Sequence, residues 1–253
     1  MKIAVIGASG KQGKMLVEEA QKRGHEVTAV VRNKSKMAGF KGAIVEKDIL
    51  ALAYSDIKDN DVIINAFGTG ASDDPILHQT VMTHLIDILA GKPNRFLVVG
   101  GASTLYVDKE HKIRLLDTPE FPDAWKGVAG SMAKAFDTLK QRNDVNWTFF
   151  SPAAFFMADG ERTGKYTLGQ DELILNSEGK SEISYADYAI AMIDEAEKGN
   201  YIKKTLHSSC RINHKGLNRP FFIARNTCEP ALPPYPYRSE KLFLYCPAKT
   251  LPI

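Results

Sequence analysis

The chain has 253 residues, enough for one large α/β domain with a buried core. Its apolar content of 44% and charged content of 25% are typical of a globular protein. The net charge of +3 is too small to favour nucleic acid or a membrane surface as a partner. Residues 213–253 carry six Lys and Arg against two acidic residues, so no basic patch belongs to the main body.

The start of the chain contains no recognisable targeting segment. Only four apolar residues separate Lys2 from Gly7, too few for a signal-peptide core, and no apolar run approaches the ~20 residues of a transmembrane helix. No cysteine precedes Cys210, and no His/Cys pair has zinc-finger spacing. We therefore predict a cytoplasmic protein with no metal site and no membrane or nucleic-acid partner.

The first 150 residues alternate between strand and helix patterns. Predicted strands cover 2–6, 26–31, 43–46, 61–66, 95–99 and 147–150, and predicted helices cover 11–23, 49–56, 75–90 and 121–142. Strands separated by helices favour a parallel sheet with right-handed crossovers. We therefore predict a Rossmann-type, doubly wound α/β fold.

The pattern changes after Ser151. A hairpin or strand pair is expected over 165–175, a helix over 184–198 and a last strand over 205–212. Ser184 and Asp187 resemble a capping box at the start of that helix. We predict one domain over 1–212, with its substrate side mainly in 151–212. Residues 213–253 are Pro-rich and aperiodic, which is typical of a loosely ordered tail; the alternative is a tail that docks on the domain or on a partner.

A glycine-rich turn joins the first strand to the first helix. Its residues are Gly7, Ala8, Ser9, Gly10, Lys11, Gln12 and Gly13. In a dinucleotide site, the three glycines allow a tight turn, close approach of the backbone to the pyrophosphate, and close packing of the helix on the sheet. The free N–H groups of the helix would then hold the pyrophosphate. The alternative is a structural turn without a ligand.

The end of the second strand indicates which dinucleotide is bound. An NAD site usually has Asp or Glu about 20 residues after the turn, to hold the ribose hydroxyls. Here the strand runs into Arg32, with Ser35 and Lys36 following and no carboxylate. These donors suit a 2′-phosphate, so we predict NADP(H) in preference to NAD(H). The alternative is a solvated basic loop.

Two further strand ends are candidates for the adenosine side. Ala66, Phe67 and Gly68 follow the fourth strand, and Asp48 and Ile49 follow the third. We predict that both segments contact the cofactor. The alternative for segment 66–68 is that it simply ends the strand at a glycine. Asp48 is alternatively a helix N-cap.

The proton-relay residues of most short-chain dehydrogenases are missing. Those enzymes use Ser and a Tyr-x-x-x-Lys pair on the helix after the fifth strand. The pattern occurs here at Tyr54–Lys58 and Tyr237–Lys241, both outside the expected window of 110–140. In that window Lys134 has Gly130 four residues before it. We therefore exclude a Ser-Tyr-Lys dehydrogenase.

Other side chains follow the fifth and sixth strands, where open α/β sheets bind ligands. Gly101 is expected to contact the cofactor, and Ser103 is the one candidate catalytic residue, with a turn serine as the alternative. A substrate pocket is expected near Tyr106, Pro152, Phe155 and Phe156. The two phenylalanines form either a platform for a flat substrate or ordinary core packing.

Taken together, these motifs resemble those of the NmrA-like atypical short-chain dehydrogenases, and more closely the NADH-flavin reductase group. The similar stretches are 7–13, 98–103, 147–154, 160–166 and 183–189, within residues 1 to about 207. The resemblance implies a reduced nicotinamide cofactor and a flavin, and it places Arg162 at the substrate pocket. The chain departs from the family in its tail and in Arg32, which conflicts with NADH.

The sequence favours an NADPH-dependent reductase of a flat electron acceptor. A flavin or quinone takes up hydride without an obligatory protein acid, so the missing tyrosine is tolerable. Flavin is expected as a substrate and not as a bound cofactor. The alternative is a non-catalytic NADP(H)-sensing regulator of NmrA type, and a homo-oligomer is compatible with both. An epimerase is disfavoured by the missing Tyr-x-x-x-Lys pair.

Overall fold

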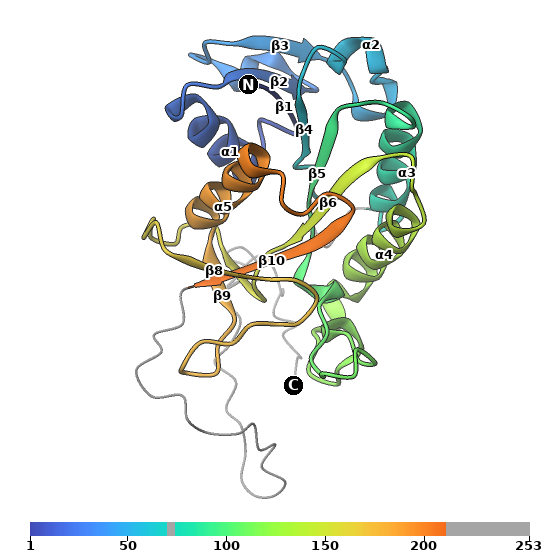
Figure 1. The fold of residues 1–253 in the computed structure, drawn as a ribbon, viewed down its shortest axis with the longest axis vertical. Coiled ribbons are helices and arrows are strands. Elements are labelled where there is room, and N and C mark those ends of the chain that lie inside the picture. Colours follow the sequence, from blue (N-terminus) through green and yellow to red (C-terminus); the bar gives the residue numbers. More distant parts are fainter. Residues whose placement is uncertain (70–73, 211–253) are drawn as a thin grey trace, which may run out of the picture. The chain divides into compact units, whose positions relative to one another are not determined.

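The computed structural model describes residues 1–69 and 74–210, which contain an eight-stranded sheet between two layers of helices (Figure 1). The strand order is β3-β2-β1-β4-β5-β6-β10-β8. Seven strands are parallel, namely β1 (Lys2–Ile6), β2 (Glu26–Val31), β3 (Ala43–Glu46), β4 (Val62–Asn65), β5 (Arg95–Val99), β6 (Asn146–Ser151) and β10 (Lys204–Cys210). Only the edge strand β8 (Tyr166–Gly169) runs antiparallel in this sheet. The predicted Rossmann-type fold is confirmed.

The helices form two pairs, one on each face of the sheet (Figure 1). On one face α1 (Lys11–Lys22) packs with α5 (Tyr185–Lys198), and on the other α3 (Leu77–Leu89) packs with α4 (Asp123–Lys140). Strand β1 is buried on both sides because its alternate residues enter different cores. Ile3 and Val5 pack beneath α1 and α5, and Ala4 packs beneath α3 and α4.

The register of the parallel strands brings their carboxyl ends to one edge. Ile6 of β1 pairs with both Val30 and Asn65, and Val99 of β5 pairs with Phe150 of β6. The loops that follow these strands therefore meet at this edge, which is where open α/β sheets bind ligands. They carry the glycine turn, Arg32, Ala66, Gly100 and Pro152.

Two predicted elements differ in the structure. The helix expected over 49–56 is a 3₁₀ turn, Ile49–Ala51, followed by the short helix α2 (Tyr54–Ile57). The hairpin expected over 165–175 is absent, because β8 pairs with β10 instead of with a neighbouring segment. Segment 170–175 has no strand of its own, and the tail predicted over 213–253 lies outside the described residues.

A second, small sheet completes the substrate side. It contains β7 (Phe155–Met157) and β9 (Glu182–Ser184), which pair in parallel. Ser184 caps α5 as predicted, since its hydroxyl accepts a hydrogen bond from the Asp187 amide at 3.0 Å. Within residues 1–69 and 74–210, no helix has the length and apolar character needed to span a membrane.

The glycine turn yields a stability prediction. A β-carbon on Gly13 would collide with the Gly7 carbonyl oxygen and lie 2.9 Å from the Ala8 α-carbon. We expect Gly13→Ala to lower the free energy of unfolding by about 2 kcal/mol, because overpacking displaces α1 from the sheet.

Urea denaturation of Gly13→Ala and Gly130→Ala measures this effect. Gly130 lies in α4 with open space around its missing β-carbon, so its alanine variant should be neutral or more stable by up to ~1 kcal/mol. Equal stabilities of the Gly13 variant and the wild type would contradict the close packing of α1.

Candidate functional site

The glycine turn has the geometry of a dinucleotide cradle. Gly7 has φ +76°, a conformation that favours glycine, and its amide donates to the Val30 carbonyl at 3.0 Å. A β-carbon there would also lie 2.9 Å from the Ala66 carbonyl oxygen. The Gly10 amide donates to the Gly7 carbonyl at 2.9 Å, which turns the chain into α1. The turn therefore passes between β2 and the end of β4 with no room for side chains at Gly7.

The amino end of α1 is left open for an anion. Its N-cap, Gly10, provides no side-chain cap, and the first turn contains no acidic residue. Lys11 is exposed in that turn, and Ser9 is half-buried just before it. Free backbone N–H groups and the helix dipole favour a phosphate at such a position. The residues present therefore fit the pyrophosphate of a dinucleotide.

Arg32 follows β2 at the same edge. Its side chain is exposed and makes no hydrogen bond or ion pair within the described part of the chain. The neighbouring Lys34 is engaged with Glu46, through its amide at 3.0 Å and its ammonium at 3.4 Å. Ser35 is exposed in the 3₁₀ turn Lys34–Met37, where its amide donates to Asn33 Oδ1. The guanidinium of Arg32, at the end of β2, therefore has no partner among the described residues.

Asp48 is predicted either to contact the cofactor or to cap a helix, and the structure shows the cap. Asp48 Oδ1 accepts from the Leu50 amide at 2.9 Å, so Asp48 is the N-cap of the 3₁₀ turn that begins at Ile49. The side chain is exposed, and this bond uses only one of its two carboxylate oxygens. Asp48 therefore serves as a cap, and a contact of Asp48 or Ile49 with the cofactor remains a prediction.

The segment after β4 is held by a short turn. The Phe67 amide donates to Asn65 Oδ1 at 3.1 Å, and Ala66 and Gly68 flank it at the edge. His78 of α3 packs edge-on against the Phe67 ring, with 5.5 Å between ring centroids. Burial lowers the pKa of His78, so it contributes a neutral ring beside this segment. The sequence analysis missed His78 because it lies ten residues beyond the motif.

Ser103 lies in the 3₁₀ turn after β5 (Ala102–Thr104) and is buried, with 6% of its surface exposed. Its hydroxyl oxygen has no hydrogen-bond partner within residues 1–69 and 74–210. Gly101 precedes it and lies against Met132 of α4, whose sulfur would be 2.6 Å from a β-carbon at that position. A buried hydroxyl without a partner costs free energy unless a water or ligand bonds to it. Ser103 therefore has an unsatisfied hydroxyl among the described residues, and its contact with a ligand remains a prediction.

Tyr106 is held in place by contacts on its ring and its backbone. The His111 ring stacks on it with 4.7 Å between centroids, and the Arg114 guanidinium lies 6.0 Å from its ring centroid. The backbone of Tyr106 bonds to Asp171 and Leu173 at 2.8 and 2.9 Å. The backbone contacts fasten the segment after β5 to the loop after β8. The place of Tyr106 in a substrate pocket stays a prediction.

The residues after β6 form an aromatic cluster with α5. Pro152 is buried and Phe155 is half-buried. The Phe156 ring lies 4.0 Å from the Tyr185 ring and 4.9 Å from the Tyr188 ring, between centroids. Phe156 is thus packed partly as core, which is the alternative considered for it, and its remaining surface borders the substrate side.

Arg162 connects the substrate side to α1. Its guanidinium donates to Glu19 at 2.8 Å, and the other oxygen of Glu19 accepts from Arg23 at 2.9 Å. Burial alone would raise the pKa of Glu19, but the hydrogen bonds from Arg162 and Arg23 outweigh it and lower that pKa. Arg23 also pairs with Asp194 of α5 at 2.7 Å. Arg162 therefore links its loop to helix α1 through Glu19. Its place in the substrate pocket stays a prediction.

The loop that carries Arg162 has a second anchor. The buried carboxylate of Asp187 accepts from the Thr163 amide at 2.9 Å, from the Thr163 hydroxyl at 2.6 Å and from the Gly164 amide at 2.8 Å. The capping-box prediction recognised Asp187 as part of a helix start. The sequence contains no sign that the Asp187 carboxylate bonds to Thr163 and Gly164, more than 20 residues earlier in the chain.

The structure confirms that the first copy of the Tyr-x-x-x-Lys pattern, Tyr54–Lys58, is out of place. The Tyr54 hydroxyl donates to Asn94 at 3.0 Å, immediately before β5, so it lies at the amino edge of the sheet. Lys134 of α4 is exposed. The second copy of the pattern, 237–241, lies outside the described residues.

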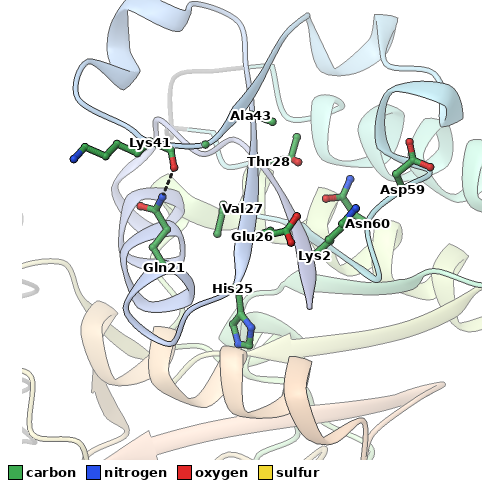
Figure 2. Close-up of a pocket in the computed structure, with 11 residues that line it drawn as sticks. Lys2, Gln21, His25, Glu26, Val27, Thr28, Lys41, Ala43, Asp59 and Asn60 are labelled. Atoms are coloured by element: carbon green, nitrogen blue, oxygen red, sulfur yellow. Dashed lines mark hydrogen bonds between the residues drawn. The ribbon is translucent and has the colours of Figure 1, made fainter.

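Two cavities of the described structure lie away from the glycine turn. One of about 470 Å³ is lined by Lys2, Glu26 and Ala43, which begin β1, β2 and β3, and it therefore opens at the amino edge (Figure 2). Another of about 430 Å³ lies beside His111 and 167–174. The first cavity lies at the edge opposite the glycine turn, so the sheet topology and not cavity size locates the candidate site.

Comparison with known proteins identifies the family of the chain. Residues 7–198 match the model of the family described as NAD(P)H-binding. The chain belongs to this family. The match begins at the first glycine of the turn and ends with α5.

Three relatives illustrate the similarity. The uncharacterized protein YwnB of Bacillus subtilis (strain 168) is 50% identical over 198 residues, which cover 78% of this chain and 92% of YwnB. SP1627 of Streptococcus pneumoniae TIGR4, described as a putative NADH-flavin reductase, is 46% identical with a TM-score of 0.79, covering 83% of this chain and 100% of that one. A putative epimerase of Bacteroides thetaiotaomicron is 36% identical with a TM-score of 0.75, covering 84% and 98%. The predicted resemblance to atypical short-chain dehydrogenases is confirmed, while the relatives' names disagree on the reaction.

His207 of β10 is a buried group that the sequence analysis did not identify. Its Nδ1 donates to the Ser151 carbonyl at 3.0 Å, and its Nε2 accepts from the Ile174 amide at 3.2 Å. The accepting nitrogen requires a neutral ring. Burial lowers the pKa of His207 to about 4, although the bond to Ser151 opposes that shift. His207 thus joins β6 to the loop after β8 only when it is uncharged.

This geometry predicts a pH dependence of stability. The native pKa of His207, about 4, lies below its ordinary value of 6.5, so only the unfolded chain binds the proton between these values. The free energy of unfolding should fall by about 3 kcal/mol from this group as the pH falls from 6.5 towards 4.

Urea denaturation across this pH range tests the effect in His207→Gln, whose amide can make both hydrogen bonds without titrating. The variant should show a shallower pH dependence than the wild type. His84→Gln, at a half-buried site where Nε2 bonds to the Leu52 carbonyl, controls for loss of an imidazole. An unchanged slope in His207→Gln would show that His207 does not carry the pH dependence.

Proposed function

We propose that this protein is an NADPH-dependent reductase that transfers hydride to a flat electron acceptor such as a flavin or quinone. The observation that carries the cofactor choice is Arg32, an exposed guanidinium without a partner in the described ranges, at the end of β2. In this position a carboxylate would favour NAD and an arginine accommodates the 2′-phosphate of NADP. Ser35 supplies a further donor in the 3₁₀ turn that follows.

At the end of the site opposite Arg32, the side chains present suit an electron acceptor that needs no proton donor from the protein. Ser103 supplies one buried hydroxyl, and the aromatic residues around Phe156 supply an apolar wall. The reduced nicotinamide supplies the hydride when bound. A flavin or quinone then takes one further proton, which solvent can deliver, so no phenol of the Tyr-x-x-x-Lys type is required.

The contacts around Arg162 and Asp187 support the same assignment. They fix loop 162–164 to α1 and α5, next to the turn proposed to hold the pyrophosphate. Rigid placement of the acceptor side relative to the cofactor is the main contribution that a protein makes to hydride transfer between two bound flat rings. The chain thereby orients the two reactants without supplying a covalent step.

Arg32→Ala tests the cofactor preference. Wild type should bind NADPH more tightly than NADH in calorimetric titrations, by roughly ten- to a hundredfold, as expected for a charge-assisted contact with the 2′-phosphate. The substitution should remove most of this difference and leave NADH affinity nearly unchanged.

Lys34→Ala is the matched control, because it removes a cation from the same loop whose ammonium pairs with Glu46. This variant should keep the preference for NADPH. Equal affinities of the wild type for the two cofactors would contradict the 2′-phosphate assignment.

Ser103→Ala tests the acceptor end. Oxidation of NADPH by FMN, riboflavin or a soluble quinone should be catalysed above background by the wild type. The variant should lose about tenfold in kcat with NADPH affinity unchanged, since one hydrogen bond to the reacting end is removed. Ser208→Ala, which removes another buried hydroxyl without a partner in the described chain, should retain activity.

A non-catalytic NADP(H) sensor is the second candidate. It is favoured by the absence of a tyrosine from the described α4 helix, where related dehydrogenases carry their proton donor. A sensor would bind NADP⁺ and NADPH with similar affinity and oxidise NADPH with none of these acceptors. That combination of results would replace the reductase proposal.

A further inference from the structure

Gln12 lies in the first turn of α1 and is buried, with 8% of its surface exposed. Its amide nitrogen, Nε2, donates to the carbonyl oxygen of Tyr185 at 3.3 Å. Its amide oxygen, Oε1, is buried and has no hydrogen-bond partner within the described residues. An amide oxygen left in this state costs roughly 1–3 kcal/mol, so the position is expected to serve a ligand.

The bond to Tyr185 fixes which end of the amide is unpaired. Rotating the amide by 180° would place Oε1 against the Tyr185 carbonyl, and two acceptors cannot form a hydrogen bond. The nitrogen therefore faces α5 and the oxygen is left over. The oxygen can only accept, so its missing partner must be an N–H or O–H donor.

This requirement excludes part of the cofactor. Ionised phosphate oxygens are acceptors, so neither the pyrophosphate nor the 2′-phosphate is the partner of Gln12 Oε1. The donors of a nicotinamide dinucleotide are the adenine amine, the ribose hydroxyls and the nicotinamide carboxamide. Gln12 is tied to the start of α5, on the substrate side where Phe156 packs on Tyr185. Arg32, at the adenosine end, follows β2 on the other side of β1.

We propose that Gln12 Oε1 accepts a hydrogen bond from the nicotinamide nucleoside of NADPH, either from the carboxamide amine or from a hydroxyl of the ribose attached to the nicotinamide. Gln12 is then a positioning residue that couples the orientation of the hydride-donating ring to α5. This inference rests on the proposed cofactor and adds to it the recognition of one half of that cofactor.

Gln12→Met tests the inference, because methionine keeps the length of the side chain and removes the acceptor. Calorimetry should compare three ligands: NADPH; 2′-phospho-ADP-ribose, which lacks nicotinamide; and 2′,5′-ADP, which lacks nicotinamide, its ribose and the phosphate attached to that ribose. The variant should bind NADPH about five- to tenfold more weakly and 2′,5′-ADP with unchanged affinity. A matching loss for 2′-phospho-ADP-ribose identifies the ribose as the donor, and no loss identifies the carboxamide.

Lys11→Met is the matched control from the same helical turn. Its exposed ammonium is expected to act on phosphate charge, so this variant should weaken NADPH and 2′,5′-ADP by similar factors. Urea denaturation of ligand-free Gln12→Met should show no loss of stability, because the substitution removes an unpaired buried oxygen together with one long hydrogen bond.

Two results would overturn the inference while leaving the cofactor proposal intact. One is an equal loss of affinity for NADPH and 2′,5′-ADP in Gln12→Met, and the other is no loss for NADPH. If the wild type binds neither NADPH nor 2′,5′-ADP, the proposed function itself fails and the role of Gln12 fails with it.

Discussion

The close approach of α1 to β1 is the constraint on which the rest of the site depends. Gly13 allows the helix to pack against the Gly7 carbonyl, and Gly7 passes between the ends of β2 and β4. This contact aims the uncapped amino end of α1 at the carboxyl edge of the sheet. It also brings the side chains of Gln12 and Glu19 within hydrogen-bonding distance of the substrate side. One backbone contact thus sets the position of both halves of the site.

The two ends of the site differ in their physical character. The adenosine end presents an exposed guanidinium, Arg32, whose affinity for phosphate depends on charge and weakens with salt. The acceptor end presents buried polar atoms without partners in the described chain, those of Ser103 and Gln12, beside an aromatic cluster. Polar atoms buried in this way have strong directional preferences because water does not compete for them. In the proposed complex, charge would select the cofactor and a few directed hydrogen bonds would orient its reacting end.

The local part of this architecture was predictable from sequence. The strand, glycine turn and helix over 2–23 are adjacent in the chain, and their periodicity and glycine spacing depend on neighbours alone. The same holds for Arg32, which is placed by the end of one short strand, and for the Ser184 cap of α5. Parallel pairing then follows from the alternation of strands and helices.

The remaining features depend on contacts between distant segments. Strand β8 pairs with β10 about 40 residues later, so no pattern within 165–175 could reveal its partner. Glu19 and Arg162 are separated by 143 residues, and each alone resembles an ordinary surface charge. His207 occupies a strand position where a polar residue gives no sign of its two distant backbone partners. Such contacts arise from the assembled fold, and a single sequence carries no local signal for them.

Backbone amide chemical shifts recorded during titration with NADPH test the central claim most directly, because they locate the ligand at one edge of the sheet. The account predicts the largest changes at 7–14, 32–36, 66–68 and 100–103, which all follow the carboxyl ends of strands. Changes centred on Lys2, Glu26 and Ala43, around the cleft at the amino edge, would contradict it.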